Sequence, residues 1–176
     1  MMSESEFSAE YYTNHERRDR FPWTLYHRPI SRRIASIVRA RSTLPTILIV
    51  GCGLEPYVDG VREISCAACD IDPRAIEACK KQYPRQADRF GVSPSAYELP
   101  SAEVFDGPFD MIVAKDVVEH VRQPERWARM LAQRLSPGGE LLLSTPNYGT
   151  GSTLGLLERT VLEWVARRDG DRKSVV

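Results

Sequence analysis

The chain has 176 residues, of which 42% are hydrophobic and 27% are charged, a length and composition that fit one globular domain. Its formal net charge is zero, which argues against a general attraction to nucleic acid or anionic membranes. The N-terminal segment is too polar for a signal peptide and no apolar run reaches about 18 residues, so we expect a cytoplasmic protein without a membrane span.

The N-terminal part of the chain is basic and aromatic. Between His15 and Arg41 there are eight arginines and two acids. An amphipathic helix is predicted here by an apolar stripe opposite the arginines, formed by Ile30, Ile34, Ile37 and Val38. The simpler interpretation is a helix with a solvated basic face. The alternative is a lid over a site for an anionic or planar substrate, with the aromatic residues Tyr11, Tyr12, Trp23 and Tyr26.

After Pro45 the pattern becomes an alternation of strands and helices. Strands are predicted at 46–50, 63–71, 95–99, 109–114 and 140–146, and helices at 73–83, 124–136 and 152–176. Such an alternation predicts an α/β fold: a Rossmann-like, mostly parallel sheet with helices on both faces. We therefore expect residues 1–43 to form an N-terminal helical lid or extension and residues 44–176 to form the main domain.

Four cysteines are present, and two of them form a single CxxC motif at Cys66 and Cys69. The motif lies in a predicted strand, where residues three apart point to opposite faces. No second CxxC or histidine pair completes a set of metal ligands. We therefore interpret these cysteines as buried strand residues and expect no metal site.

The run Gly51-Cys52-Gly53 directly follows the first predicted strand, and Asp70 ends the second. Glycines at this turn let a cofactor approach the backbone, and an acid about 20 residues later can bind ribose hydroxyls. A dinucleotide would need a third glycine where Pro56 stands, and its pyrophosphate would meet the negative charge of Glu55. S-adenosylmethionine has no phosphate, so this loop favours S-adenosylmethionine over the dinucleotide cofactor that a reductase would bind.

Five segments in order carry a family resemblance: "ILIVGCG", "CDIDPRAIEAC", "YELP", "FDMIVAKDVVEHV" and "LSPGGELLLSTPN". Together they resemble the class I S-adenosylmethionine-dependent methyltransferases, most closely the small-molecule branch related to ubiquinone biosynthesis. The resemblance covers roughly residues 44–148. It implies that S-adenosyl-L-methionine is the cofactor and that a small organic molecule accepts the methyl group.

The resemblance also implies roles for individual residues. Gly51, Cys52 and Gly53 would pass under the methionine portion of the cofactor, and Lys115 and Asp116 would line its methionine end. The adenosine portion would be bound by Asp70 at the ribose hydroxyls, by Ile71 packing on the adenine, and by Ser95 near the adenine amino group. Pro137, Gly138 and Gly139 would form the turn before the fifth strand.

Ile49 stands where the family usually has an acid for the methionine amino group, whose part would fall to Glu55 or Asp116. His120 is the candidate base for an acceptor that must lose a proton, although it could instead pack or cap its helix. Asn147 and Tyr148 are placed to touch the acceptor.

The C-terminal antiparallel hairpin of the family is expected to be missing, because no strand-like run follows the last predicted helix. A homo-oligomer or a partner chain would then cover the incomplete edge of the sheet. This leaves a second functional alternative, a non-catalytic or truncated methyltransferase-like protein that acts as a partner subunit.

Overall fold

A computed structural model describes residues 24–41, 43–57 and 66–145 of the chain. The predicted lid residues Tyr11, Tyr12 and Trp23 lie outside the described residues, as do the acceptor candidates Asn147 and Tyr148 and the predicted C-terminal helix.

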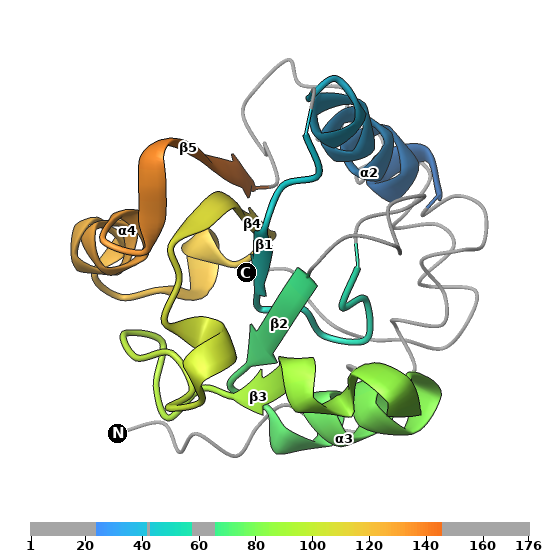
Figure 1. The fold of residues 1–176 in the computed structure, drawn as a ribbon, viewed down its shortest axis with the longest axis vertical. Coiled ribbons are helices and arrows are strands. Elements are labelled where there is room, and N and C mark those ends of the chain that lie inside the picture. The colour runs from blue at the N-terminus through green and yellow to red at the C-terminus, as the bar shows by residue number, and fades with distance from the viewer. Residues whose placement is uncertain (1–23, 42, 58–65, 146–176) are drawn as a thin grey trace, which may run out of the picture.

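A five-stranded, all-parallel sheet forms the centre of the described structure (Figure 1). Its strands are β1 (Ile47–Val50), β2 (Cys66–Asp70), β3 (Phe90–Val92), β4 (Phe109–Lys115) and β5 (Leu135–Ser144). They lie in the order β3-β2-β1-β4-β5, so the chain builds outward from β1 to β3 and then returns to the other side of β1. The switch in strand order therefore falls between β1 and β4, which is the place where open α/β sheets bind ligands.

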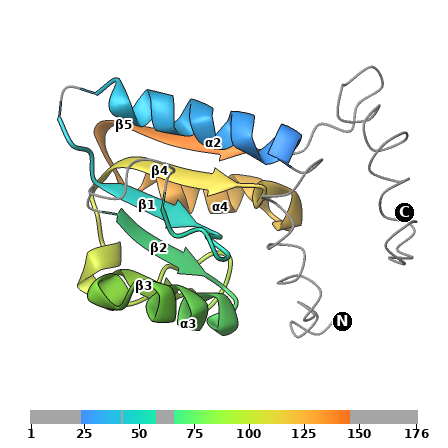
Figure 2. The same cartoon turned by 90° about the vertical axis from the view of Figure 1, so that its right-hand side faces the viewer.

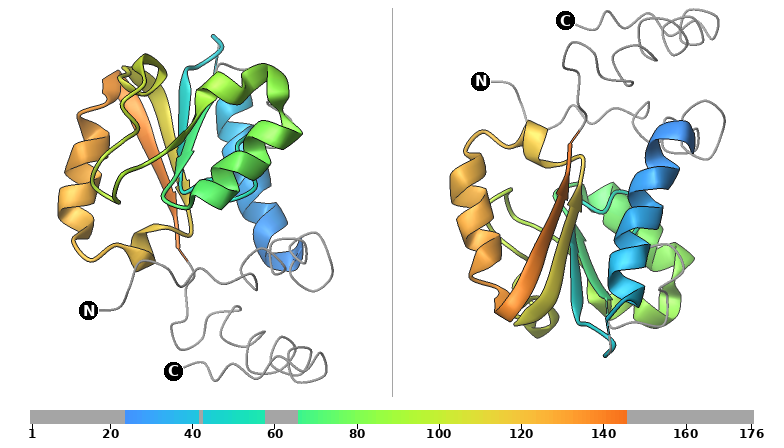
Figure 3. Two further views of the ribbon diagram at one scale, coloured as in Figure 1. Left: turned by 90° about the horizontal axis from the view of Figure 1, so that it is seen from below. Right: turned by 90° about the horizontal axis from the view of Figure 1, so that it is seen from above.

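Helices cover both faces of this sheet. They are α2 (Thr24–Arg39), α3 (Pro73–Gln82) and α4 (Pro124–Ala132), with short 3-10 turns η1 (Pro84–Arg89), η2 (Glu103–Phe105) and η3 (Val118–His120). Figures 2 and 3 show α2 and α3 on one face and α4 on the other. The α/β fold with helices on both faces is thus confirmed.

The core is divided in two by the alternation of side chains along the strands. Ile47 and Ile49 of β1 pack with α3 and with α2, and Ala35 and Val38 of α2 are buried there. Leu48 and Val50 point to the other face and pack with α4, where Trp127 and Leu131 are buried. The CxxC cysteines follow the same rule, as predicted, because Cys66 lies in the first of these clusters and Cys69 in the second.

Two predicted strands are misplaced, and the helix predicted at 124–136 ends at Ala132. The third strand is Phe90–Val92, whereas residues 95–99 form a turn with an isolated antiparallel bridge between Ser95 and Glu98. The sequence 137–139 lies within β5 and does not precede it, since the ladder begins at Phe109–Leu135 and resumes at Met111–Glu140. The additional residues of β5 bulge out of the ladder, and Gly138 takes a φ of +80° there.

Candidate functional site

The loop after β1 is built around two glycines with left-handed backbone conformation. Gly51 has a φ of +65° and Gly53 a φ of +52°, values that side chains other than glycine rarely tolerate. The backbone N–H of Cys52 donates to the carbonyl of Cys69 at 3.1 Å, which ties the loop to β2. A Cβ on Gly51 would collide with Cγ2 of Val117, so the loop also packs closely on the segment after β4.

Asp70, at the carboxyl end of β2, is held by two backbone donors. Its Oδ2 accepts the N–H of Gly53 at 2.8 Å, and its Oδ1 accepts the N–H of Asp72 at 2.9 Å. Burial raises the pKa of this carboxyl, although the backbone hydrogen bonds act in the opposite direction. An ionised carboxylate has about four lone-pair sites, so Asp70 keeps capacity to accept a further hydrogen bond beyond those from the backbone.

Two apolar side chains are exposed beside Asp70, at the ends of adjacent strands. Ile71 is 48% exposed and follows Asp70 directly, and Val92, 40% exposed, is the register partner of Asp70 on β3. Large apolar side chains at this edge of the sheet offer a surface for a flat ring. Val92 is not among the predicted site residues, because the sequence pattern predicts the third strand after residue 94.

Lys115 ends β4, and its ammonium group forms an ion pair with the carboxylate of Glu55 in the loop after β1. Asp116 follows with a φ of +56°, and its N–H donates to the carbonyl of Ser144 at 3.0 Å. The hydroxyl of Ser144 in turn donates to Oδ1 of Asp116 at 3.2 Å. The ends of β4 and β5 are thereby fastened together, and Ser144 is a second residue that the sequence did not single out.

Ile49 is 7% exposed and packs in the cluster beneath α2 and α3. Its register partners are Ala68 of β2 and Val113 of β4, both buried. At this position isoleucine therefore contributes to the core, and a negative charge at the loop after β1 comes from Glu55.

Ser95 and His120 lie on the turns that follow β3 and β4. The hydroxyl of Ser95 accepts the N–H of Tyr97 at 3.2 Å and so stabilises its own turn. His120 is exposed on η3, and its backbone N–H donates to the carbonyl of Val117 at 3.0 Å. Direct contacts join Gly53 to Asp70 and Glu55 to Lys115. The hydrogen bonds of Ser95 and His120 described above, by contrast, stay within their own turns.

A parallel sheet with this strand order, a glycine-rich loop after β1 and an acid ending β2 together define a Rossmann-like nucleotide-cofactor domain. A family profile described as "Methyltransferase domain" matches residues 17–171. The chain belongs to this family, the class I S-adenosylmethionine-dependent methyltransferases, in the branch that includes the ubiquinone-biosynthesis enzymes. The predictions of the family and of its cofactor, S-adenosyl-L-methionine, are confirmed.

Curated relatives give the same result. The chain is 31% identical over 134 residues to a ubiquinone biosynthesis O-methyltransferase of Caulobacter vibrioides, covering 73% of this chain and 52% of the relative. It is 32% identical over 135 residues to a probable S-adenosylmethionine-dependent methyltransferase of Mycobacterium tuberculosis H37Rv, covering 74% and 44%. The chain thus spans about half the length of the curated relatives that it matches.

Solved structures share the fold at low sequence identity. A putative S-adenosyl-L-methionine-dependent methyltransferase from Methanococcus maripaludis has a TM-score of 0.63 and 16% identity, covering 98% of this chain and 81% of the other. The sugar N-methyltransferase KedS8 from a Streptoalloteichus species also has a TM-score of 0.63 and 16% identity, covering 88% and 60%.

The described part of the chain contains no helix with the length and apolar character needed to cross a bilayer. Within the same residues, no three histidine, cysteine or acidic side chains gather as they would around a metal ion.

Proposed function

We propose that this chain provides the cofactor-binding domain of a methyltransferase that transfers the methyl group of S-adenosylmethionine to a small organic acceptor. The observation that carries the proposal is the position of Asp70. Its half-buried carboxylate joins the glycine loop to the end of β2 and keeps capacity to accept further hydrogen bonds. A ribose presents two adjacent hydroxyl donors, which such a carboxylate can bind together.

The side chains around Asp70 fit the remaining parts of the cofactor. Ile71 and Val92 offer an apolar surface suited to an adenine ring. Glu55 and Lys115 supply one negative and one positive group, which match the ammonium and carboxylate of a methionine. The family's acid for the methionine amino group is replaced here by Ile49. We therefore propose that Glu55 binds that amino group instead.

Methyl transfer requires little further chemistry from the protein, because the cofactor's sulfonium group supplies an activated methyl group. The domain has to hold the acceptor in line with that methyl group and keep both in a fixed orientation. His120 is exposed after β4 and is proposed as the base for an acceptor that must lose a proton. Replacing it by alanine should leave cofactor affinity unchanged and lower turnover.

Calorimetric titration of the purified chain with S-adenosylhomocysteine tests the proposal, because this product analogue needs no acceptor. Saturable binding with one site per chain is the expected result. No heat of binding at millimolar ligand would refute the proposal for this chain.

The alternative is a methyltransferase-like subunit without activity of its own. It is favoured by β5, a border strand of the described sheet, on which Leu143 is 46% exposed. A chain of this kind would gain methyltransferase activity on addition of its partner. Incubation with labelled S-adenosylmethionine and a set of phenolic and amine acceptors separates the two functions, since turnover by the isolated chain supports the enzyme.

A further inference from the structure

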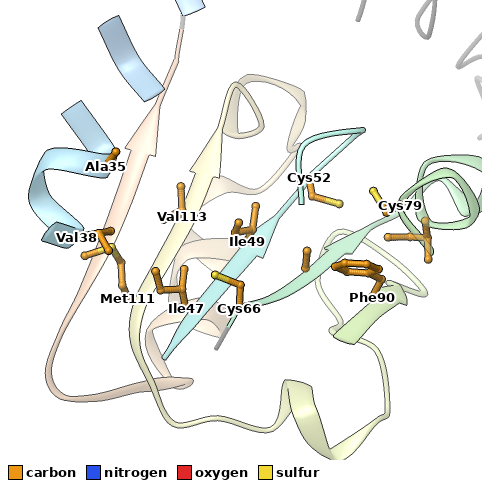
Figure 4. Packing of buried hydrophobic residues seen from close by; sticks show 12 residues of the cluster. Ala35, Val38, Ile47, Ile49, Cys52, Cys66, Cys79, Phe90, Met111 and Val113 are labelled. Carbon is orange, nitrogen blue, oxygen red and sulfur yellow. The ribbon is translucent and has the colours of Figure 1, made fainter. Parts of the chain in front are cut away.

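Two cysteines from distant parts of the sequence meet behind the cofactor loop. Cys52 lies between the two loop glycines and Cys79 lies on α3, and Figure 4 shows their sulfur atoms pointing toward one another. Both sulfurs lie against the carbonyl oxygen of Gly53, at 3.6 Å for Cys52 and 3.4 Å for Cys79. The two thiols thus share one acceptor, which holds the cysteines side by side. The pair is therefore in contact and connects α3 to the glycine loop.

The four cysteines differ in acidity, and the difference singles out this pair. Burial raises the pKa of Cys66 to about 11 and that of Cys69 to about 12, which keeps both thiols protonated. Hydrogen bonding to Cys52 lowers the pKa of Cys79, and the same contact, together with burial, raises the pKa of Cys52. Cys79 is thus the cysteine that most readily becomes a thiolate, and its neighbour retains the proton.

We propose that Cys52 and Cys79 form an oxidation-sensitive pair, which a hydroperoxide converts into a disulfide that alters the cofactor loop. In the first step, with hydrogen peroxide as the oxidant, the Cys79 thiolate attacks one peroxide oxygen, the O–O bond breaks and hydroxide leaves, so that Cys79 becomes a sulfenic acid. In the second step the Cys52 sulfur attacks the Cys79 sulfur. The S–S bond forms as the S–O bond breaks, and the Cys52 proton leaves with the hydroxide as water. Two electrons pass from the sulfurs to the peroxide.

The disulfide would act on the loop through Gly53. In the reduced protein the carbonyl of Gly53 lies against both thiols, and its N–H donates to Asp70. A covalent bond removes both thiol protons and draws Cys52 toward α3, so the peptide between the glycines shifts relative to Asp70. This consequence rests on the proposed function, because it concerns the loop that would bind S-adenosylmethionine. Both sulfurs are buried, so peroxide reaches them only when the loop moves. Bound cofactor should hold the loop in place, and we therefore also expect it to slow the oxidation.

The experiment treats the folded chain with hydrogen peroxide, blocks the remaining thiols with iodoacetamide and maps the peptides without reduction. The expected product is one peptide pair that joins Cys52 to Cys79, with Cys66 and Cys69 alkylated after unfolding. Cys79→Ser and Cys52→Ser should each prevent it, and Cys66→Ser, a buried control on β2, should not. A disulfide involving Cys66 or Cys69, or four alkylated cysteines after peroxide treatment that is long enough to oxidise a model dithiol, would overturn the proposal.

Cofactor affinity provides the second measurement. Oxidised wild type should bind S-adenosylhomocysteine at least tenfold more weakly than reduced wild type, and dithiothreitol should restore the affinity. Cys79→Ser should keep the same affinity before and after peroxide treatment. Equal affinity of the oxidised and reduced wild type, with the disulfide present, would overturn the effect on the loop. If the reduced chain does not bind the ligand, the proposed function fails, while peptide mapping still decides whether the pair oxidises.

Discussion

The ammonium group of Lys115, at the end of β4, is paired with the carboxylate of Glu55, in the loop after β1. The pair bridges the two strands between which the strand order switches, and the side chain of Lys115 is only 15% exposed. A methionine moiety carries one ammonium and one carboxylate. We therefore expect the two residues to serve as a matched pair of charges when cofactor is bound and to neutralise each other without it.

Replacing Lys115 by alanine should weaken binding of S-adenosylhomocysteine about tenfold, because a charge-assisted contact to the ligand carboxylate is lost. Glu55→Gln should have an effect of similar size through the ammonium. The control is Lys80→Ala, which removes another lysine from an ion pair, with Glu77 on α3. Calorimetry measures all three variants. Affinity unchanged in Lys115→Ala would exclude this pair from the cofactor site.

Gly51→Ala should destabilise the domain more than Gly138→Ala, although both glycines have positive φ. The left-handed backbone costs about 1 kcal/mol with any Cβ, and this cost is common to both variants. At Gly138 a Cβ would meet nothing within 4 Å, whereas at Gly51 it would collide with Val117. Overpacking adds about 1–3 kcal/mol at Gly51. If urea unfolding gave equal losses of free energy for the two variants, Val117 would have moved aside at no cost in stability.

Asp110 lies near the start of β4, at the amino ends of the strands, and accepts hydrogen bonds from neighbouring segments. These bonds should make stability depend on pH. Its Oδ2 accepts the N–H of Thr46 at 2.8 Å and its Oδ1 accepts the hydroxyl of Ser136 at 3.0 Å. These hydrogen bonds, those from Thr46 first, lower the pKa of Asp110 below its ordinary value of 3.8. A lowered pKa in the folded state means that the contribution to stability is complete well above pH 3.8 and is lost as the pH falls below it.

Unfolding of the wild type and of Asp110→Asn, measured in urea across the acid range, checks this expectation. The difference in unfolding free energy should be constant at neutral pH and should shrink below pH 3.8. Asp106→Asn is the control, because the ion pair of Asp106 with Arg134 spans 3.8 Å between largely exposed side chains. A difference for Asp110→Asn that stays constant down to pH 2 would contradict the lowered pKa.

Much of the fold could be predicted because the central strands have strong local patterns. The apolar runs of β1 and β4 are bounded by turn residues, and Pro73 stands at the start of α3, as expected. β3 was missed because it has three residues, with a glycine at its centre and an exposed valine at its end. The extent of β5 was missed because proline and two glycines normally mark a turn, whereas here they bulge from a continuing strand.

The placement of the glycine loop beside Asp70 was predictable, because both residues are tied to a motif, while their part in binding stays a prediction. The ion pair of Glu55 with Lys115 depends on the spatial proximity of segments 60 positions apart, which no local pattern reports. The contact of Cys52 with Cys79 is of the same kind, since it depends on the packing of α3 against the loop. Burial of Ile49 likewise depends on strand register.

Above all, we propose that Asp70 binds the ribose of S-adenosylmethionine at the carboxyl edge of the sheet. Calorimetry with S-adenosylhomocysteine on the wild type, Asp70→Ala and Asp106→Ala tests it most directly, with circular dichroism confirming that each variant is folded. We predict saturable binding for the wild type and Asp106→Ala, and an affinity at least a hundredfold lower for Asp70→Ala. Equal affinity of folded Asp70→Ala and wild type would show that Asp70 does not bind the ribose.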